Sequence, residues 1–268
     1  MKIGVSTACM FGRCHIEDAV AEYGRLGIRY AEAFLNTFSE YTPDFIKMLR
    51  KTADDNKVKI ASVHGYGLAY EPSMFSKYDR SQEDAFKIFE GMMTATEALG
   101  ADCYVFHGPA RLKPARRLTL NFDNIAKVVD RAADMAKEHG VKFAYETVHW
   151  CFYNYPGFCE DLNKKIKSDN VYYVFDIKQT AQAGYDPMKF IKKMDGRVAN
   201  IHMCDFVHEG RYVTPKMPFT GEMDFAQLRD LLKKTGYDGT MMLEVYGDDY
   251  GETTELYDMW KKFNEYFG

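Results

Sequence analysis

Four apolar runs in the sequence each carry, at or near their end, a residue that can bind a metal or move a proton. KFAYET, YYVFDI and TMMLEV carry Glu146, Asp176 and Glu244, and RVANIHMCDF carries His202. An apolar run suits a buried strand, so a polar residue where the run stops lies at the tip of that strand. The recurrence of one design in four places predicts that these tips share a site.

The four residues supply three carboxylates and one imidazole. Such donors suit Mn²⁺, Mg²⁺, Co²⁺ or Zn²⁺ with open coordination positions, and the absence of cysteine from the set disfavours a closed structural zinc site. Taken singly, a buried histidine is more often a hydrogen-bonded core residue, and a carboxylate at a strand end often caps the following helix. Three carboxylates buried together need a neutralising charge, however, so the set predicts one divalent metal ion.

Apolar runs alternate with amphipathic segments of helix length along the whole chain, and this alternation must position the four residues. Strands are predicted over 2–7, 29–35, 59–65, 102–108, 142–147, 171–177, 198–204 and 240–246. Helices are predicted over 15–26, 42–55, 81–99, 121–139, 156–167, 186–194, 224–235 and 253–266. Nearly continuous apolar runs are typical of parallel strands that helices cover.

Eight strand–helix units in 268 residues predict an α/β fold, a single (β/α)₈ TIM barrel domain over residues 1–268. The active site of such a barrel lies at the C-terminal ends of the strands. His64 and His107 end the third and fourth runs and are therefore predicted on the same face. A doubly wound sheet is the rival fold, but no G-x-G-x-x-G follows the first strand and no change of composition divides the chain.

The boundaries of several helices carry their own signals. Thr42 followed by Pro43 predicts a helix start, and Gly100, Gly140 and Gly236 predict helix ends. Three longer connections are predicted to be loops on the active-site face: 66–80, 109–120 and 206–223.

The second of these loops is basic, with Arg111, Lys113, Arg116 and Arg117. These residues could clamp a phosphate, but a solvated lid is the preferred interpretation.

Composition restricts the class of protein. Hydrophobic residues make up 46% and charged residues 28% of the chain, and the formal net charge is −4, so no overall positive field attracts nucleic acid or anionic lipid. The six cysteines are scattered without a C-x-x-C pair and are expected to be reduced thiols. Neither a targeting segment nor a long apolar run is recognised, so a cytoplasmic protein without a membrane span is expected.

Seven motifs follow one another along the chain: SVHG, FHGP, YETVHW, FDIKQTAQAGYDP, NIHMCD, PFTGEMDF and GYDGTMMLEVY. In order and spacing they resemble the sugar phosphate isomerase/epimerase family of xylose isomerase-like barrels. That family includes inosose isomerases, ketose 3-epimerases and the family 2 AP endonucleases. The resemblance extends from KIGVST to LEVYGDDY.

The resemblance implies that Glu146, Asp176, His202 and Glu244 hold the metal. It also implies that the two glutamates are the acid/base pair, placed on opposite faces of a bound sugar. One removes a proton beside the carbonyl, the metal stabilises the resulting enediolate, and the proton is returned from the same or the opposite face. Two opposed bases give epimerisation, whereas one base that shuttles between adjacent carbons gives aldose–ketose isomerisation.

Further residues are expected around the substrate. His64 and His107 would bind its hydroxyls or the developing oxyanion, and Gln179 would read another hydroxyl. By the resemblance, Arg211 would also contact the substrate. Trp150 would stack on the sugar or, preferably, line the pocket.

Asp205, three residues after His202, is expected either to orient that histidine as a second-sphere residue or to have a plain loop role. The predicted partner is a small-molecule carbohydrate, with no nucleic acid and no membrane. Dimers and tetramers are common among such barrels, so a homo-oligomer is compatible with the sequence.

The sequence departs from its relatives at three places. AP endonucleases have a histidine where this chain has Gln179, and the Asp-x-His pair of their seventh loop is absent from 206–223. Phe219 stands where a glycine is usual. The alternatives to an isomerase or epimerase are a dehydratase or lyase that uses the same metal site, an AP endonuclease-like phosphodiesterase, and a non-catalytic sugar-binding barrel.

Overall fold

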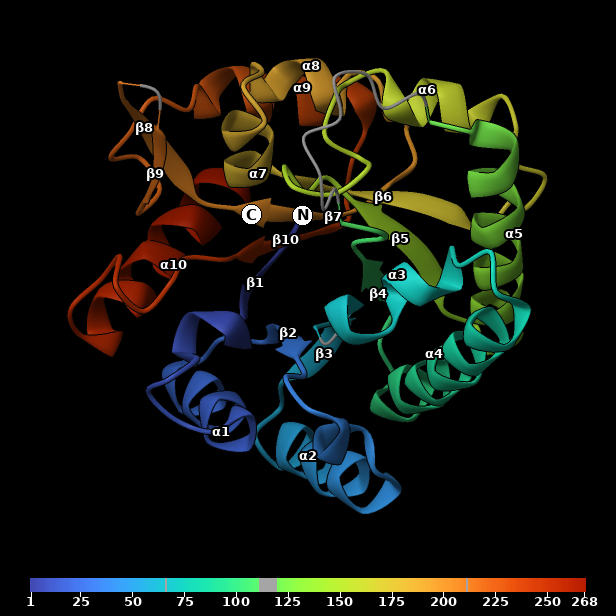
Figure 1. The fold of residues 1–268 in the computed structure, drawn as a ribbon. Coiled ribbons are helices and arrows are strands. Elements are labelled where there is room, and N and C mark those ends of the chain that lie inside the picture. The colour runs from blue at the N-terminus through green and yellow to red at the C-terminus, as the bar shows by residue number, and fades with distance from the viewer. Residues whose placement is uncertain (66, 111–119, 211) are drawn as a thin grey trace.

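Eight parallel strands close into a barrel, and helices surround it (Figure 1). The structure is a computed structural model and describes residues 1–65, 67–110, 120–210 and 212–268. The barrel strands are β1 (Lys2–Ser6), β2 (Tyr30–Phe34), β3 (Lys59–His64), β4 (Cys103–Phe106), β5 (Lys142–Glu146), β6 (Val171–Asp176), β7 (Val198–Met203) and β10 (Thr240–Leu243). Their order around the barrel is β1-β10-β7-β6-β5-β4-β3-β2. The predicted TIM barrel is therefore confirmed.

The eight predicted helices are all present, some with shorter bounds. They are α1 (Ile16–Leu26), α2 (Pro43–Asp55), α4 (Asp79–Leu99), α5 (Phe122–Glu138), α6 (Phe158–Asn163), α8 (Pro187–Ile191), α9 (Phe225–Thr235) and α10 (Thr253–Phe267). Gly100, Gly140 and Gly236 follow α4, α5 and α9 in the left-handed region, which a residue without Cβ adopts at little cost. Thr42 precedes α2, but its hydroxyl donates to the carbonyl of Ser39 and does not cap the helix.

The segments predicted as loops contain regular structure that the sequence analysis missed. The connection 66–80 holds the short helices η3 (Gly67–Ala69) and α3 (Glu71–Met74). The connection 206–223 was wrongly predicted to be wholly loop, because β8 (Asp205–Glu209) and β9 (Tyr212–Lys216) pair as an antiparallel hairpin. The hairpin turns near Gly210, whose φ of +66° favours glycine.

A further short helix, α7 (Ile177–Gln182), starts directly at the end of β6. Two 3₁₀ segments, η1 (Thr7–Met10) and η2 (Phe38–Tyr41), follow β1 and β2. These elements are only a few residues long, and hydrophobic periodicity cannot reveal elements of that length.

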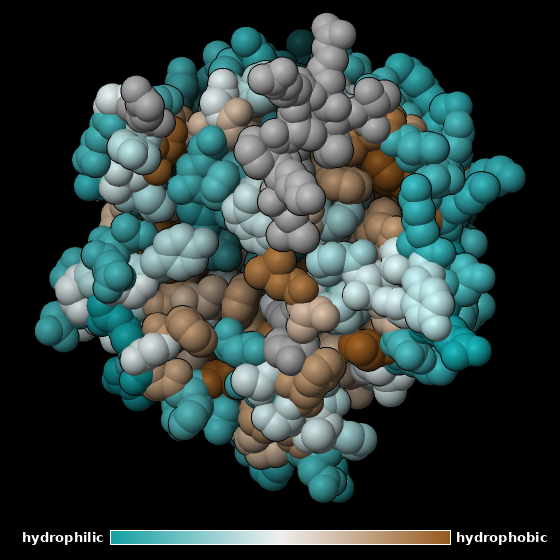
Figure 2. Space-filling model, viewed as in Figure 1, coloured by the Kyte–Doolittle hydropathy of each residue, from teal (hydrophilic) through white to brown (hydrophobic). Residues whose placement is uncertain are grey.

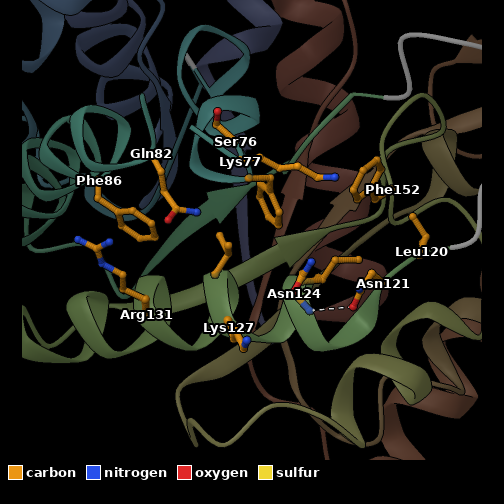
Figure 3. Close-up of a pocket in the computed structure, with 13 residues that line it drawn as sticks. Ser76, Lys77, Gln82, Phe86, Leu120, Asn121, Asn124, Lys127, Arg131 and Phe152 are labelled. Carbon is orange, nitrogen blue, oxygen red and sulfur yellow. Dashed lines mark hydrogen bonds between the residues drawn. The ribbon is translucent and has the colours of Figure 1, made fainter. Parts of the chain in front are cut away.

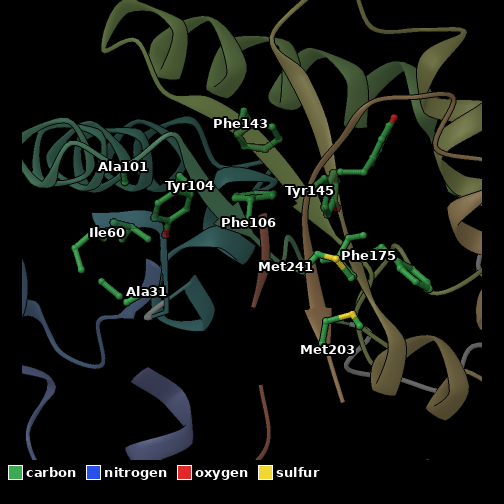
Figure 4. Close-up of a cluster of buried hydrophobic side chains, with 14 of the residues drawn as sticks. Ala31, Ile60, Ala101, Tyr104, Phe106, Phe143, Tyr145, Phe175, Met203 and Met241 are labelled. Atoms are coloured by element: carbon green, nitrogen blue, oxygen red, sulfur yellow. The ribbon is translucent and has the colours of Figure 1, made fainter. Parts of the chain in front are cut away.

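Side chains alternate between the two sides of each strand, and this alternation separates core from site. Tyr104, Phe106 and Phe143 belong to the buried hydrophobic cluster on the helix side (Figure 4). Their rings pack against Phe89 of α4. Residues at the alternate strand positions point to the opposite side of the sheet. These residues, which include Ala144 and Val174, form a separate small cluster. Glu146 lies two positions after Ala144, and Asp176 lies two positions after Val174. Both carboxylates therefore point to the same side as this cluster, into the barrel.

On the face seen in Figure 2, hydrophilic residues dominate the outer helices and hydrophobic residues gather nearer the middle. Among the helices that the structure describes, none combines the length and apolar character needed to cross a membrane.

Candidate active site

The structure brings the four predicted metal-binding residues together. Glu146 and Asp176 end β5 and β6, His202 lies near the end of β7, and Glu244 directly follows β10. All four are buried, and their potential ligand atoms lie within 4.8 Å of one another. Residues up to 98 positions apart in sequence therefore face one small volume, because neighbouring parallel strands end at the same rim.

The Nδ1 atom of His202 is the centre of this cluster. It lies 2.8 Å from Oε1 of Glu146, 2.8 Å from Oε2 of Glu244 and 3.7 Å from Oδ2 of Asp176. Burial alone would lower the pKa of His202, but the carboxylates of Glu244, Glu32 and Glu146 raise it well above its usual value. Burial would raise the pKa of Glu146 and Glu244, but His202 lowers the pKa of both below the usual range.

The residues fit a divalent cation. The Oε2 atoms of Glu146 and Glu244 are buried, and each lies 2.8 Å from an imidazole nitrogen, but among the described residues neither receives a well-aligned hydrogen bond. Buried polar atoms in native proteins are nearly always satisfied, so two such oxygens beside one imidazole call for a missing partner. A cation would supply that partner and would also offset the repulsion between three carboxylates.

Glu32 of β2 belongs to the same cluster, although the sequence analysis did not select it. Its side chain is fully buried, and its Oε2 lies 3.1 Å from Nε2 of His202, on the far side of the imidazole from Glu146. Its signal in the sequence was a glutamate inside the apolar run RYAEAFL. It was missed because it lies in the middle of its run, whereas the four selected residues lie at or near the ends of theirs.

His64 and His107 lie beside Glu146, as their positions at strand ends predicted. Their Nε2 atoms are 2.6 Å apart, and Nε2 of His107 is 2.8 Å from Oε2 of Glu146. Burial lowers the pKa of His107, but the carboxylates of Glu146, Glu71 and Glu244 together raise it, so the net shift is upward. Trp150 presents its ring edge-on to His107, with ring centroids 6.0 Å apart.

Gln179 and Asp205 are held by contacts within the chain. Oε1 of Gln179 accepts hydrogen bonds from the backbone N–H and from Nδ1 of His149, at 3.1 and 2.6 Å. The carboxylate of Asp205 accepts from the backbone N–H groups of Phe206, Gly221 and Met223. These contacts of Asp205 correspond to the loop role.

Arg211 and the basic residues of the second loop lie outside the described residues. The latter are Arg111, Lys113, Arg116 and Arg117.

Lys178 is a buried cation that the sequence analysis also missed. Its Nζ donates to the hydroxyl of Tyr246 at 2.8 Å and lies 3.9 Å from Oδ2 of Asp176. Burial lowers the pKa of Lys178, but Glu244 and Asp176 raise it well above its usual value. The ammonium thus offsets part of the negative charge of the cluster. Its signal was its place in the first turn after Asp176, in FDIKQT.

Glu71 of α3 connects the first long connection to the rim of the barrel. One of its oxygens accepts hydrogen bonds from the backbone N–H groups of His107 and Gly108, at 2.9 and 2.7 Å. The side chain is buried, and burial raises its pKa to about 7. Glu71 therefore fixes the backbone from which the His107 side chain projects.

A separate hollow of about 570 Å³ lies outside the barrel, beside α4 and α5. Figure 3 shows Gln82 and Phe86 from α4 on one side of it and Asn124 and Arg131 from α5 on the other. Arg131 is already paired with Glu83 and stacks on the Phe86 ring. None of the clustered carboxylates and imidazoles described above lines this hollow.

Comparisons with known proteins agree on the fold. The family described as xylose isomerase-like TIM barrel matches residues 18–262. An inosose dehydratase of Clostridium botulinum (strain Alaska E43 / Type E3) is 21% identical over 263 residues, which cover 87% of this chain and 82% of that protein.

Two solved structures are similar over nearly the whole chain. A D-tagatose 3-epimerase-like protein has a TM-score of 0.81 and 19% identity, covering 100% of this chain and 98% of the other. The IOLI protein, whose structure contains a bound zinc atom, has a TM-score of 0.80 and 20% identity, covering 98% of this chain and 96% of the other.

Proposed function

Because the chain belongs to the xylose isomerase-like TIM barrel family, we propose that it is a divalent-metal-dependent isomerase or epimerase. Its substrate would be a small carbohydrate with a carbonyl group, that is a ketose, an inosose or one of their phosphates. One observation carries the proposal. Two glutamates with unsatisfied buried oxygens meet an aspartate and the Nδ1 atom of a histidine at the tips of four barrel strands.

In this proposal Glu146, Asp176, His202 and Glu244 hold one divalent ion, Mn²⁺, Mg²⁺, Co²⁺ or Zn²⁺. When bound, the ion supplies positive charge that stabilises the negative charge developing on the substrate oxygens. A carboxylate that binds the ion through one oxygen keeps the other free for proton transfer.

Glu146 and Glu244 would transfer the protons. They approach the centre of the barrel from β5 and β10, which β6 and β7 separate in the barrel order. One glutamate would take the proton from the carbon beside the carbonyl. Return by the other glutamate inverts that carbon, whereas return by the same glutamate to the neighbouring carbon, with transfer of a hydroxyl proton between the two oxygens, isomerises the sugar.

The remaining predicted residues would place the substrate. His64 and His107 would bind its hydroxyls beside Glu146, and Trp150 would wall that side of the pocket. Gln179 and Arg211 keep their predicted substrate contacts as part of this proposal, and Asp205 would hold the loop after β7. A homo-oligomer and a cytoplasmic location also remain predictions.

Dehydration of an inosose is the second candidate, and the similarity to an inosose dehydratase favours it. The first step is the same removal of a proton beside the carbonyl. The electron pair left on carbon then expels the hydroxyl group of the next carbon, and a protonated side chain converts that group to water. The same two glutamates could serve both reactions.

The test is proton–deuterium exchange measured by NMR. The protein is incubated with Mg²⁺ in D₂O and a panel of ketoses, inososes and ketose phosphates. Exchange beside the carbonyl, abolished by chelator, is the expected result. Loss of water without return of deuterium would select the dehydratase, and no reaction across the panel with metal bound would contradict both candidates.

A further inference from the structure

Glu32 lies on the inner side of the barrel beneath the proposed metal site, and both of its oxygens are fully engaged. Oε1 accepts from Oγ of Ser6 at 3.2 Å and contacts Nδ1 of His64 at 3.2 Å. Oε2 accepts from Oγ of Ser62 at 2.7 Å and from Nδ2 of Asn200 at 3.0 Å, and it contacts Nε2 of His202 at 3.1 Å. Unlike Glu146 and Glu244, this carboxylate has no unsatisfied oxygen with which to bind a metal.

The neighbours of Glu32 act as donors. Oδ1 of Asn200 accepts from the backbone N–H of Ile201 and the hydroxyl of Thr240, each at 2.9 Å, which fixes its amide nitrogen toward Glu32. An ionised carboxylate has acceptors only, so each imidazole nitrogen that faces it must carry a hydrogen.

We propose that Glu32 is a positioning residue that sets the tautomers of two imidazoles at once. His202 carries its proton on Nε2, which leaves Nδ1 as the metal ligand, and His64 carries its proton on Nδ1, which leaves Nε2 as an acceptor. A carboxylate behind a metal-binding imidazole orients the ring and raises its basicity. The His202 half of the inference rests on the proposed metal site, but neither half depends on which substrate is used.

The tautomer of His64 also determines which nitrogen of His107 carries a proton. Since Nε2 of His64 is an acceptor and lies 2.6 Å from Nε2 of His107, the latter must donate. In the neutral ring Nδ1 of His107 is then an acceptor, and this buried atom has no hydrogen-bond partner among the described residues. Glu32 thereby prepares, through two rings, an acceptor that suits a hydroxyl group of the substrate.

The first test uses the wild-type protein, labelled with ¹⁵N in its seven histidines and loaded with diamagnetic Zn²⁺. Long-range ¹H–¹⁵N correlation spectra distinguish the two tautomers of each ring, and His64→Gln and His107→Gln assign two of the signals. We expect the proton on Nδ1 of His64, on Nε2 of His107 and on Nε2 of His202. A proton on Nε2 of His64, or zinc bound through Nε2 of His202, would overturn the inference.

The second test is Zn²⁺ affinity measured by calorimetry. Glu32→Gln places an NH₂ group against one or more of the donors, and loss of such a supporting partner typically weakens metal binding by about 10–100-fold. Glu32→Asp keeps the acceptor chemistry and should recover part of the affinity. Glu265→Gln, which removes a carboxylate from an exposed position on α10, should leave the affinity unchanged.

Wild-type affinity in a folded Glu32→Gln protein would contradict the role of Glu32. If that variant does not fold, the histidine tautomers in the wild-type spectra still test the inference. If no substrate of the panel reacts but the histidines have the expected tautomers, the proposed function is rejected and this inference still stands.

Discussion

Glu146 and Glu244 are the residues on which the proposed chemistry depends. We expect Glu146→Gln and Glu244→Gln each to slow proton exchange by about 10²–10⁴-fold, the usual contribution of a general acid or base. An amide preserves the size of the side chain but cannot accept and return a proton at this position. The measurement is the initial exchange rate at saturating metal, with Glu265→Gln on the exposed surface of α10 as control. An unchanged rate in either variant would move the proton transfer to another group.

The buried side chain of Glu71 should make the free energy of unfolding depend on pH. Its pKa is about 7 in the folded protein and 4.5 in the unfolded reference, so between these values the folded protein binds the extra proton. Stability from this group is therefore present at low pH and is lost as pH rises through about 7. Glu71→Gln removes that dependence. Relative to wild type, the variant should gain up to about 3 kcal/mol in the free energy of unfolding between pH 4.5 and pH 8.

The measurement for Glu71 is urea denaturation of both proteins at the two pH values. Glu265→Gln, at an exposed site on α10, is the control for removal of a glutamate charge. A difference between wild type and Glu71→Gln that does not change with pH would show that folding does not raise the pKa of Glu71.

At the scale of elements, the loop after β7 depends on Asp205. Asp205→Asn retains one acceptor oxygen and turns an NH₂ group toward at least one of the three backbone N–H donors that now meet the carboxylate. We expect a loss of about 1–3 kcal/mol in the free energy of unfolding, the cost of an unsatisfied buried group. Metal affinity should not change. Asp224→Asn is the matched control because asparagine caps a helix as well as aspartate does, here α9.

The segment before α9 contains a second testable feature, Phe219. Its φ of +62° lies in the left-handed region, so the chain takes a glycine-like path although glycine is absent. Its ring packs against Phe225, Phe263 and Tyr266. We expect both Phe219→Gly and Phe219→Ala to lower stability through lost packing. Alanine should be worse by about 1 kcal/mol because it also keeps the backbone strain. Urea denaturation would contradict this account if alanine were the more stable variant.

The barrel could be predicted because its strands are nearly continuous apolar runs separated by marked helices. The ends of those runs also selected Glu146, Asp176, His202 and Glu244, which lie together in the structure. Glu32 could not be found in that way, since its role depends on a contact with His202, 170 residues away, across the barrel interior. A single sequence shows which side chains alternate between the two sides of a strand. It does not show which side chains meet across a barrel.

At the scale of the whole molecule, the cluster concentrates negative charge in a net-negative chain. Glu32, Glu146, Asp176 and Glu244 surround His202, and Lys178 is the buried amine beside them. Repulsion among these carboxylates opposes folding, and an ion that binds only the folded protein opposes unfolding. Mn²⁺ or Mg²⁺ at 100 times its Kd should therefore add about 2.7 kcal/mol to the free energy of unfolding.

Thermal and urea denaturation with and without metal would measure this increment, and chelator should reverse it. Asp176→Asn should reduce it because the amide is a weaker ligand, whereas Asp248→Asn, at an exposed position beyond β10, should retain it. Asp176→Asn also removes one repelling charge and can keep the α7 cap hydrogen bond through its Oδ1, so its metal-free form should be no less stable than the metal-free wild type. If metal raised the free energy of unfolding equally in Asp176→Asn and Asp248→Asn, the stabilising ion would bind elsewhere on the molecule.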